Sequence, residues 1–165
     1  MIDLKEIKIK ILKKENFYFL LIIFIIFFLD RYSKLEILRN FSDNSLYIND
    51  YLNLYLVWNT GIGFGLLSFD TNLIYNLITT LIGLVIIILI MIGIKSEYSE
   101  KIIFSIIVGG ALGNFYDRLY FKAVPDFIDL HYGNFHWFTF NVADIFITIG
   151  ILILIIKNFF LKINK

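Results

Sequence analysis

Four apolar runs, separated by polar segments, define the pattern of the chain. They cover residues 17–29, 73–94, 102–112 and 138–156. A helix needs about 20 apolar residues to cross the hydrocarbon core of a bilayer, so the second run is long enough by itself. The first run can cross if its helix continues beyond Asp30, and the third if it continues towards Phe121. The pattern therefore predicts four spanning helices, at about residues 15–35, 72–94, 101–121 and 138–157.

The segment between the first two runs, about residues 36–70, is too polar to span a membrane. Within it, Leu-Asn-Leu-Tyr-Leu-Val-Trp-Asn partly alternates, which is typical of a short strand or hairpin. The first run follows basic residues, but no small-x-small cleavage site follows it, so we interpret it as a retained helix. The predicted fold is an all-α integral membrane protein, a single membrane-embedded domain (1–165) with four transmembrane helices. A small extracytoplasmic β-strand or hairpin joins the first two helices.

The distribution of lysine and arginine predicts the orientation of these helices. Of the 15 basic residues, most lie in the N-terminal tail, in the loop between the second and third runs, and in the C-terminal tail. Basic residues are enriched on the cytoplasmic side of membrane proteins. Both termini are therefore predicted to be cytoplasmic, and Asp30, Asp126 and Asp144 are predicted to lie at the outer face.

The composition supports a membrane protein. The chain is 59% hydrophobic and 18% charged, with a mean hydropathy of +0.78, whereas soluble domains carry about a quarter charged residues. The net charge of +1 provides no basic surface for nucleic acid, so no nucleic-acid partner is expected. The absence of cysteine excludes disulfides, thiol nucleophiles and cysteine-bound metals.

Two carboxylates, Asp126 and Asp144, border the last apolar run. A charge at such a position is costly unless it is paired, hydrated or functional. If the two carboxyl groups meet, repulsion and desolvation keep one of them protonated while the other is ionised. Such a pair supplies the acid and the base that activate water against an amide carbonyl. The sequence does not show that the two groups meet.

Other polar residues lie at the ends of the apolar runs. Asp30 and Lys34 are four apart and can form an ordinary interfacial ion pair. Asn59 and Gly61 begin a glycine-rich segment before the second run, where the backbone can bend closely. Asn141 is three residues before Asp144 and is expected to face the same way on the fourth helix.

The third run combines small and polar residues. Gly109 and Gly113 have the spacing of close helix packing in lipid. Asn114 and Arg118 share a helical face and can grip a peptide carbonyl or a phosphate, while Asp117 flanks that face. An equally acceptable interpretation is a structural role, in which Asp117 and Arg118 pair with neighbouring helices and hold them together.

A metal or serine-based mechanism has little support. His131 and His136, with Asp129 nearby, are five apart, a spacing that does not favour one helical face, and no HExxH motif is present. The serines lack a GxSxG context. We therefore expect no metal site and no cofactor.

Five short motifs occur in a fixed order along the chain. They are DRYSK (30–34), NTGIGFG (59–65), GGALGNFYDR (109–118), VPDFID (124–129) and FNVAD (140–144). In this order and on this topology, the chain resembles the bacterial lipoprotein signal peptidases, the type II signal peptidase family. The resemblance implies an aspartic-type endopeptidase of the cell inner membrane, which removes the signal peptide from diacylglyceryl-modified prolipoproteins before the lipidated cysteine. It also implies contact with membrane lipid, inhibition by globomycin-type cyclic peptides, and a monomer.

The resemblance assigns roles by position. Asp126 and Asp144 fall on the catalytic pair, with Asp117 as the main rival for a place in it. The positions that shape the site or contact substrate are Asp30, Lys34, Asn59, Gly61, Asn114, Asp117, Arg118 and Asn141.

Two other functions are consistent with the residues alone. A small membrane transporter or channel subunit could use intramembrane Asp, Asn and Arg as an ion path. The polar residues gather at one face, however, and no inverted repeat is present. A lipid-modifying transferase with an Asp-bound metal would lose its activity with a chelator, which the peptidase would survive.

Overall fold

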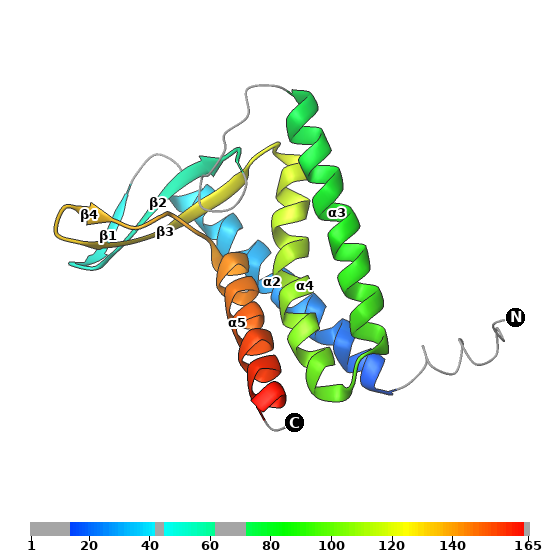
Figure 1. Cartoon of the computed structure of the whole chain (residues 1–165). Coiled ribbons are helices and arrows are strands. Elements are labelled where there is room, and N and C mark those ends of the chain that lie inside the picture. The colour runs from blue at the N-terminus through cyan, green and yellow to red at the C-terminus, as the bar shows by residue number, and fades with distance from the viewer. Residues whose placement is uncertain (1–13, 42–44, 62–71, 164–165) are drawn as a thin grey trace, which may run out of the picture.

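Four helices and a four-stranded antiparallel sheet make up the described part of the computed structural model, which covers residues 14–41, 45–61 and 72–163 (Figure 1). The helices are α2 (Lys14–Asn40), α3 (Asn72–Lys95), α4 (Tyr98–Tyr120) and α5 (Val142–Ile163). The strands are β1 (Leu46–Asn49), β2 (Leu52–Asn59), β3 (Val124–Tyr132) and β4 (Phe135–His136).

Three helices in the described residues are long and apolar enough to cross a membrane: Leu73–Lys95, Tyr98–Tyr120 and Val142–Phe160. The first and third of these bury little of their surface within the protein and expose large apolar side chains, such as Leu77 and Ile155. Apolar surface of this extent is stable in lipid but not in water. The chain is therefore a multi-pass membrane protein.

Helix α4 is the centre of the bundle and packs against the other three helices. Its glycines permit close approach: a Cβ on Gly109 would lie 2.8 Å from Cβ of Ile26 in α2, and one on Gly110 would lie 2.6 Å from the Ala143 carbonyl oxygen in α5. The close packing predicted from the spacing of Gly109 and Gly113 is confirmed, since a Cβ on Gly113 would overlap the Asp30 carboxylate of α2.

Replacement of Gly113 by alanine is expected to destabilise the protein by about 1–3 kcal/mol, the usual cost of overpacking a rigid site. The added methyl group meets a fully buried carboxylate. The measurement is thermal unfolding of the purified protein in detergent. Gly83→Ala is the matched control, because its methyl group would meet only the Phe115 ring. Equal stability of Gly113→Ala and the parent chain would contradict the packing described here.

The sheet lies beyond the helix ends at which α2 finishes and α5 begins (Figure 1). Its order is β1-β2-β3-β4, with every neighbouring pair antiparallel. The hairpin predicted between the first two helices is confirmed as β1 and β2. The register of β2 against β3 shifts between Leu54 and Val57, and Val57 is the partner of Asp126.

Two expectations from the sequence are wrong. The fold class included no strand after the third helix, but β3 and β4 lie between α4 and α5, and Asp126 is on β3. The fourth helix was expected from residue 138, but α5 begins at Val142. Phe138 and Phe140 before Asn141 are apolar, yet Phe140 forms a bridge with Ile128 of β3 instead of a helical turn.

Candidate active site

Asp126 is held on β3 by two carboxamides. Its side chain is nearly inaccessible, with 2% of the residue exposed. The Nδ2 group of Asn59, at the end of β2, donates to one carboxylate oxygen at 2.8 Å. The Nδ2 group of Asn141 donates to the other oxygen at 2.6 Å. Both oxygens of this carboxyl group are therefore oriented by neutral donors.

Two causes raise the pKa of Asp126 from 3.8 to about 7. The larger is burial, and the second is the negative charge of Asp144. The hydrogen bonds from Asn59 and Asn141 and the positive charge of Lys34 act in the opposite direction but do not compensate. A carboxyl group with this pKa still holds its proton in about half of the molecules at neutral pH.

Asp144 lies in the first turn of α5, where a capping box fixes it. The Asp144 N–H donates to Oδ1 of Asn141 at 3.1 Å, and the Asn141 N–H donates to Oδ2 of Asp144 at 3.2 Å. This reciprocal pattern marks Asn141 as the N-cap residue, although the sequence suggested a helical position. Nδ2 of Asn114 donates to Oδ1 of Asp144 at 2.8 Å. The Asn141 carboxamide thus links the Asp126 carboxyl group to the backbone of Asp144.

Both carboxyl groups line one cavity of about 290 Å³ between α3, α4, α5 and the sheet. Asn114 and Arg118 contribute to its polar end. Much of the remaining wall is apolar, with Ile82, Ala111, Val124, Ile147 and Ile151. A cavity of this kind combines a small acidic centre with a surface suited to aliphatic groups.

A buried ionic cluster around Lys34 of α2 lies next to the cavity and contacts the network that holds Asp144. Lys34 is fully buried, and its ammonium group donates to Asp30 at 2.8 Å, to Asp117 at 2.7 Å and to Oδ1 of Asn114 at 2.8 Å. All three donors of the lysine are used. Asn114 therefore accepts from Lys34 with its oxygen and donates to Asp144 with its nitrogen, which fixes its orientation.

Asp30 and Asp117 have structural partners within the same cluster. The second oxygen of Asp30 accepts from the Ala143 N–H at 3.0 Å, which joins α2 to the start of α5. Asp117 also pairs with the Arg31 guanidinium at 2.6 Å. The expected Asp30–Lys34 pair is thus one part of a larger cluster, and the carboxylate of Asp117 is held by cations of α2.

Arg118 contacts the protein backbone. Its Nη2 group donates to the Gly61 carbonyl at 2.6 Å, while the Gly61 N–H donates to Oδ1 of Asn59 at 2.9 Å. These bonds position Asn59 for its contact with Asp126. The rest of the NTGIGFG motif, residues 62–65, lies outside the described residues.

The structure brings all the candidate residues chosen from the sequence into one hydrogen-bonded network. The sequence did not single out Arg31, although its position next to Asp30 on an otherwise apolar helix is a signal that it is paired. It also did not identify the isoleucines of the cavity wall, because they are indistinguishable in sequence from those that face lipid.

The fold and this site define a class: a multi-pass membrane protein in which two carboxyl groups, the buried Asp126 and the partly buried Asp144, line one cavity at one end of its helices. A model of the family described as signal peptidase (SPase) II matches residues 22–160. The chain belongs to the signal peptidase II family.

Individual relatives agree with this membership. The lipoprotein signal peptidase of Pelagibacter ubique (strain HTCC1062) is 52% identical over 155 residues, which cover 92% of this chain and 93% of that protein. The lipoprotein signal peptidase of Francisella tularensis subsp. mediasiatica (strain FSC147) is 46% identical over 122 residues, which cover 72% and 76% of the two chains. A bacterial membrane enzyme solved by the in meso method at 2.3 Å resolution is similar with a TM-score of 0.76 and 30% identity, over 90% of this chain and 91% of that one.

Proposed function

We propose that this chain is a membrane aspartic endopeptidase that removes the signal peptide from diacylglyceryl-modified prolipoproteins, cleaving before the lipidated cysteine. The single observation that carries the proposal is the cavity lined by both Asp126 and Asp144 in a chain of the signal peptidase II family. The names of the relatives, lipoprotein signal peptidases, support the substrate class.

In this proposal the two carboxyl groups share one proton. The ionised group takes a proton from a water molecule, whose oxygen attacks the scissile carbonyl carbon, and the protonated group donates to the carbonyl oxygen. Collapse of the tetrahedral intermediate breaks the C–N bond, and a proton passes to the amine of the lipidated cysteine. Because the two groups interact, their pKa values belong to the pair, and the roles of acid and base are not assigned to individual residues. The chemistry requires no metal and no cofactor.

The surrounding residues have positioning roles. Asn59 and Asn141 orient Asp126, Asn114 and the backbone of Asn141 orient Asp144, and Arg118 orients Asn59 through Gly61. Lys34, Asp30 and Asp117 hold the helices that carry these groups. The apolar wall of the cavity suits the apolar part of the signal peptide and the acyl chains of the substrate, which can remain in the bilayer.

The proposed topology is a single membrane-embedded domain (1–165) with four spans. These are α2 and the three helices described above as long and apolar enough to cross a membrane. Exposed apolar side chains of α2, such as Phe17, Phe24 and Phe28, suit contact with lipid. The charged residues Asp30, Arg31 and Lys34 are buried and paired within the protein. Lysines at or near the helix ends remote from the sheet, such as Lys14, Lys95 and Lys101, support a topology with both termini in the cytoplasm and the site at the outer face of the inner membrane. The protein acts as a monomer and is inhibited by globomycin-type cyclic peptides.

The test of this function is an assay with the purified chain and a purified prolipoprotein, with and without the diacylglyceryl group. Mass spectrometry is expected to show cleavage before the lipidated cysteine only for the modified substrate, both with and without a chelator. Cleavage that stops on removal of metal would favour a metal-dependent reaction. An inactive chain that is correctly folded would refute the proposal.

The activity is expected to fall as the pH rises through about 7, because Asp126 then loses its proton. The stability of the folded chain changes with pH in the same direction. The pKa of Asp126 is raised above its unfolded value of 3.8, so its contribution to stability is complete below about pH 4 and is lost as the pH rises through 7. The profile of kcat/KM against pH measures the alkaline limb.

A direct control uses Asp144→Asn, which removes the neighbouring charge and should lower the pKa of Asp126, as measured by carboxyl 13C NMR. An unchanged pKa of Asp126 in this variant would show that the two groups do not interact.

A further inference from the structure

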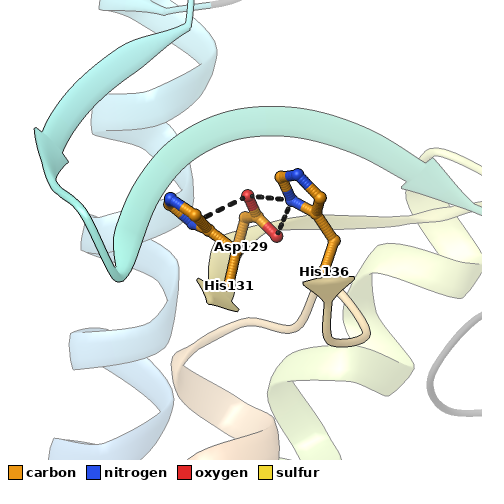
Figure 2. Close-up of side chains that lie close together, drawn as sticks. All are labelled: Asp129, His131 and His136. Atoms are coloured by element: carbon orange, nitrogen blue, oxygen red, sulfur yellow. Dashed lines mark hydrogen bonds and ion pairs between the residues drawn. The ribbon is translucent and has the colours of Figure 1, made fainter. Parts of the chain in front are cut away.

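A second polar cluster lies on the hairpin of β3 and β4 and has no role in the proposed cleavage. Asp129 and His131 are two residues apart on β3, so their side chains lie on the same face of the strand. His136 on β4 is the register partner of His131, which places it on that face as well. Figure 2 shows the Asp129 carboxylate between the two imidazole rings.

The contacts within this cluster are short. Nδ1 of His136 lies 2.9 Å and 3.1 Å from the two oxygens of Asp129, and Nδ1 of His131 lies 3.5 Å from the nearer one. One ligand atom from each of the three residues lies within 4.8 Å of the other two. Asp129 is fully buried, whereas half of the His136 side chain is exposed, so the cluster can be reached from water.

Two buried atoms beside Asp129 have no hydrogen-bond partner among the described residues: Nδ1 of His131 and Oδ1 of Asn53. The His131 side chain is only 10% exposed, and its Nδ1 atom is directed at the carboxylate. Asn53 is the register partner of Asp129 on β2. Buried polar atoms without partners are costly and therefore rare, so a group that binds at this position would satisfy them.

We propose that Asp129, His131 and His136 bind a zinc ion. Two imidazole nitrogens and one carboxylate oxygen form a donor set that suits Zn²⁺. Ligand atoms at about 2.0–2.1 Å from a tetrahedral zinc lie about 3.3 Å from each other. The carboxylate–imidazole separations of 2.9 Å and 3.5 Å bracket that value. A water molecule in the fourth position would complete the tetrahedron.

The sequence argued against a metal because residues five apart do not share a helical face. In the hairpin the same spacing is favourable, since the turn between Tyr132 and Phe135, with Gly133 at a φ of 57°, brings His131 and His136 opposite each other. Asp129 and His131 on β3 and His136 on β4 therefore have their side chains on the same face of the hairpin.

This zinc ion is separate from the proposed catalytic pair. Asp126 is three residues before Asp129, so strand alternation places the two side chains on opposite faces of β3. The ion would join β4 to the strand that carries Asp126 and stabilise the sheet. The inference does not depend on the proposed peptidase activity, because metal binding can be measured without a substrate.

The experiment is equilibrium dialysis of the full-length, chelator-treated protein in detergent against buffered Zn²⁺, followed by elemental analysis. We expect about one zinc per chain, a higher unfolding temperature with zinc, and an X-ray absorption spectrum with two imidazole ligands. His136→Gln and the double variant His131→Gln/His136→Gln should bind at least about tenfold more weakly. Because His136 is half exposed, its replacement is compatible with a folded chain.

Asp50→Asn, which removes an exposed carboxylate in the turn between β1 and β2, is the matched control and should bind zinc normally. Unchanged affinity in the folded double variant, or no zinc bound by the parent chain, would overturn the proposal. The cluster would then be a buried carboxylate paired with two histidines. An equal loss of zinc in Asp50→Asn would also overturn it, since binding would then depend on another surface.

Discussion

Asp126→Asn and Asp144→Asn should each lower the rate of prolipoprotein cleavage by about 10²- to 10⁴-fold, the range expected for loss of an acid–base group. Asparagine has nearly the same shape as aspartate, and its oxygen can still accept from Asn59 or Asn114. It cannot accept the proton of water, and its amide cannot act as the acid. The measurement is the single-turnover rate with a diacylglyceryl-modified substrate.

Three controls separate chemistry from folding in this experiment. Each variant should keep the thermal unfolding temperature of the parent within a few degrees. Asp50→Asn, at an exposed carboxylate, should cleave at the normal rate. Asp117→Asn tests the rival assignment, and we expect cleavage wherever this variant is folded, because the Asp117 carboxylate is held by Lys34 and Arg31. If both Asp126→Asn and Asp144→Asn cleave normally, the catalytic pair is refuted.

Lys34→Met is expected to destabilise the protein by about 3–5 kcal/mol, the usual cost of removing one partner from a buried ion pair. The side chains of Lys34, Asp30 and Asp117 are all fully buried. Methionine has a similar length but leaves Asp30 and Asp117 without the ammonium group. It also frees the Asn114 oxygen, so the orientation of Asp144 is weakened and the cleavage rate should fall as well. Denaturant-induced unfolding and the cleavage assay measure the two effects.

The triple variant Lys34→Met/Asp30→Asn/Asp117→Asn removes the uncompensated charges and should recover part of the lost stability. Lys157→Met is the matched control, because this lysine is partly exposed in its pair with Glu100 and should cost less than about 1 kcal/mol. A Lys34→Met chain as stable as the parent would show that the cluster does not support the bundle.

Elements with a strong local pattern in the sequence could be predicted, and those without one could not. Helix α3 was predicted to within a residue because its apolar run contains no charge. The strand Leu52–Asn59 was identified by its alternation. Strand β3 was not, because Pro125 and two aspartates are unfavourable in a strand. The start of α5 was placed too early because hydropathy does not distinguish an apolar bridge residue such as Phe140 from a helical one.

The sequence predicted which residues belong to the candidate site, but not how they contact one another. The ordered motifs selected residues that the structure joins in one network. The contacts themselves connect distant positions, such as Asp30 with Ala143, which are separated by 113 residues. No local pattern encodes such pairs. The sequence also left open whether Asp117 has a structural role, and the two cations of α2 that hold it support that role.

The capping box at the start of α5 makes the assembly of the site depend on a single helical turn. Asn141 starts the helix and also holds Asp126, so fraying of this turn would break the link between the two carboxyl groups that runs through Asn141. The lifetime of that link is then the lifetime of the turn, and the amide hydrogens of Ala143 and Asp144 report on it. Slow hydrogen exchange at these two amides would mean that the enzyme is assembled before the substrate arrives.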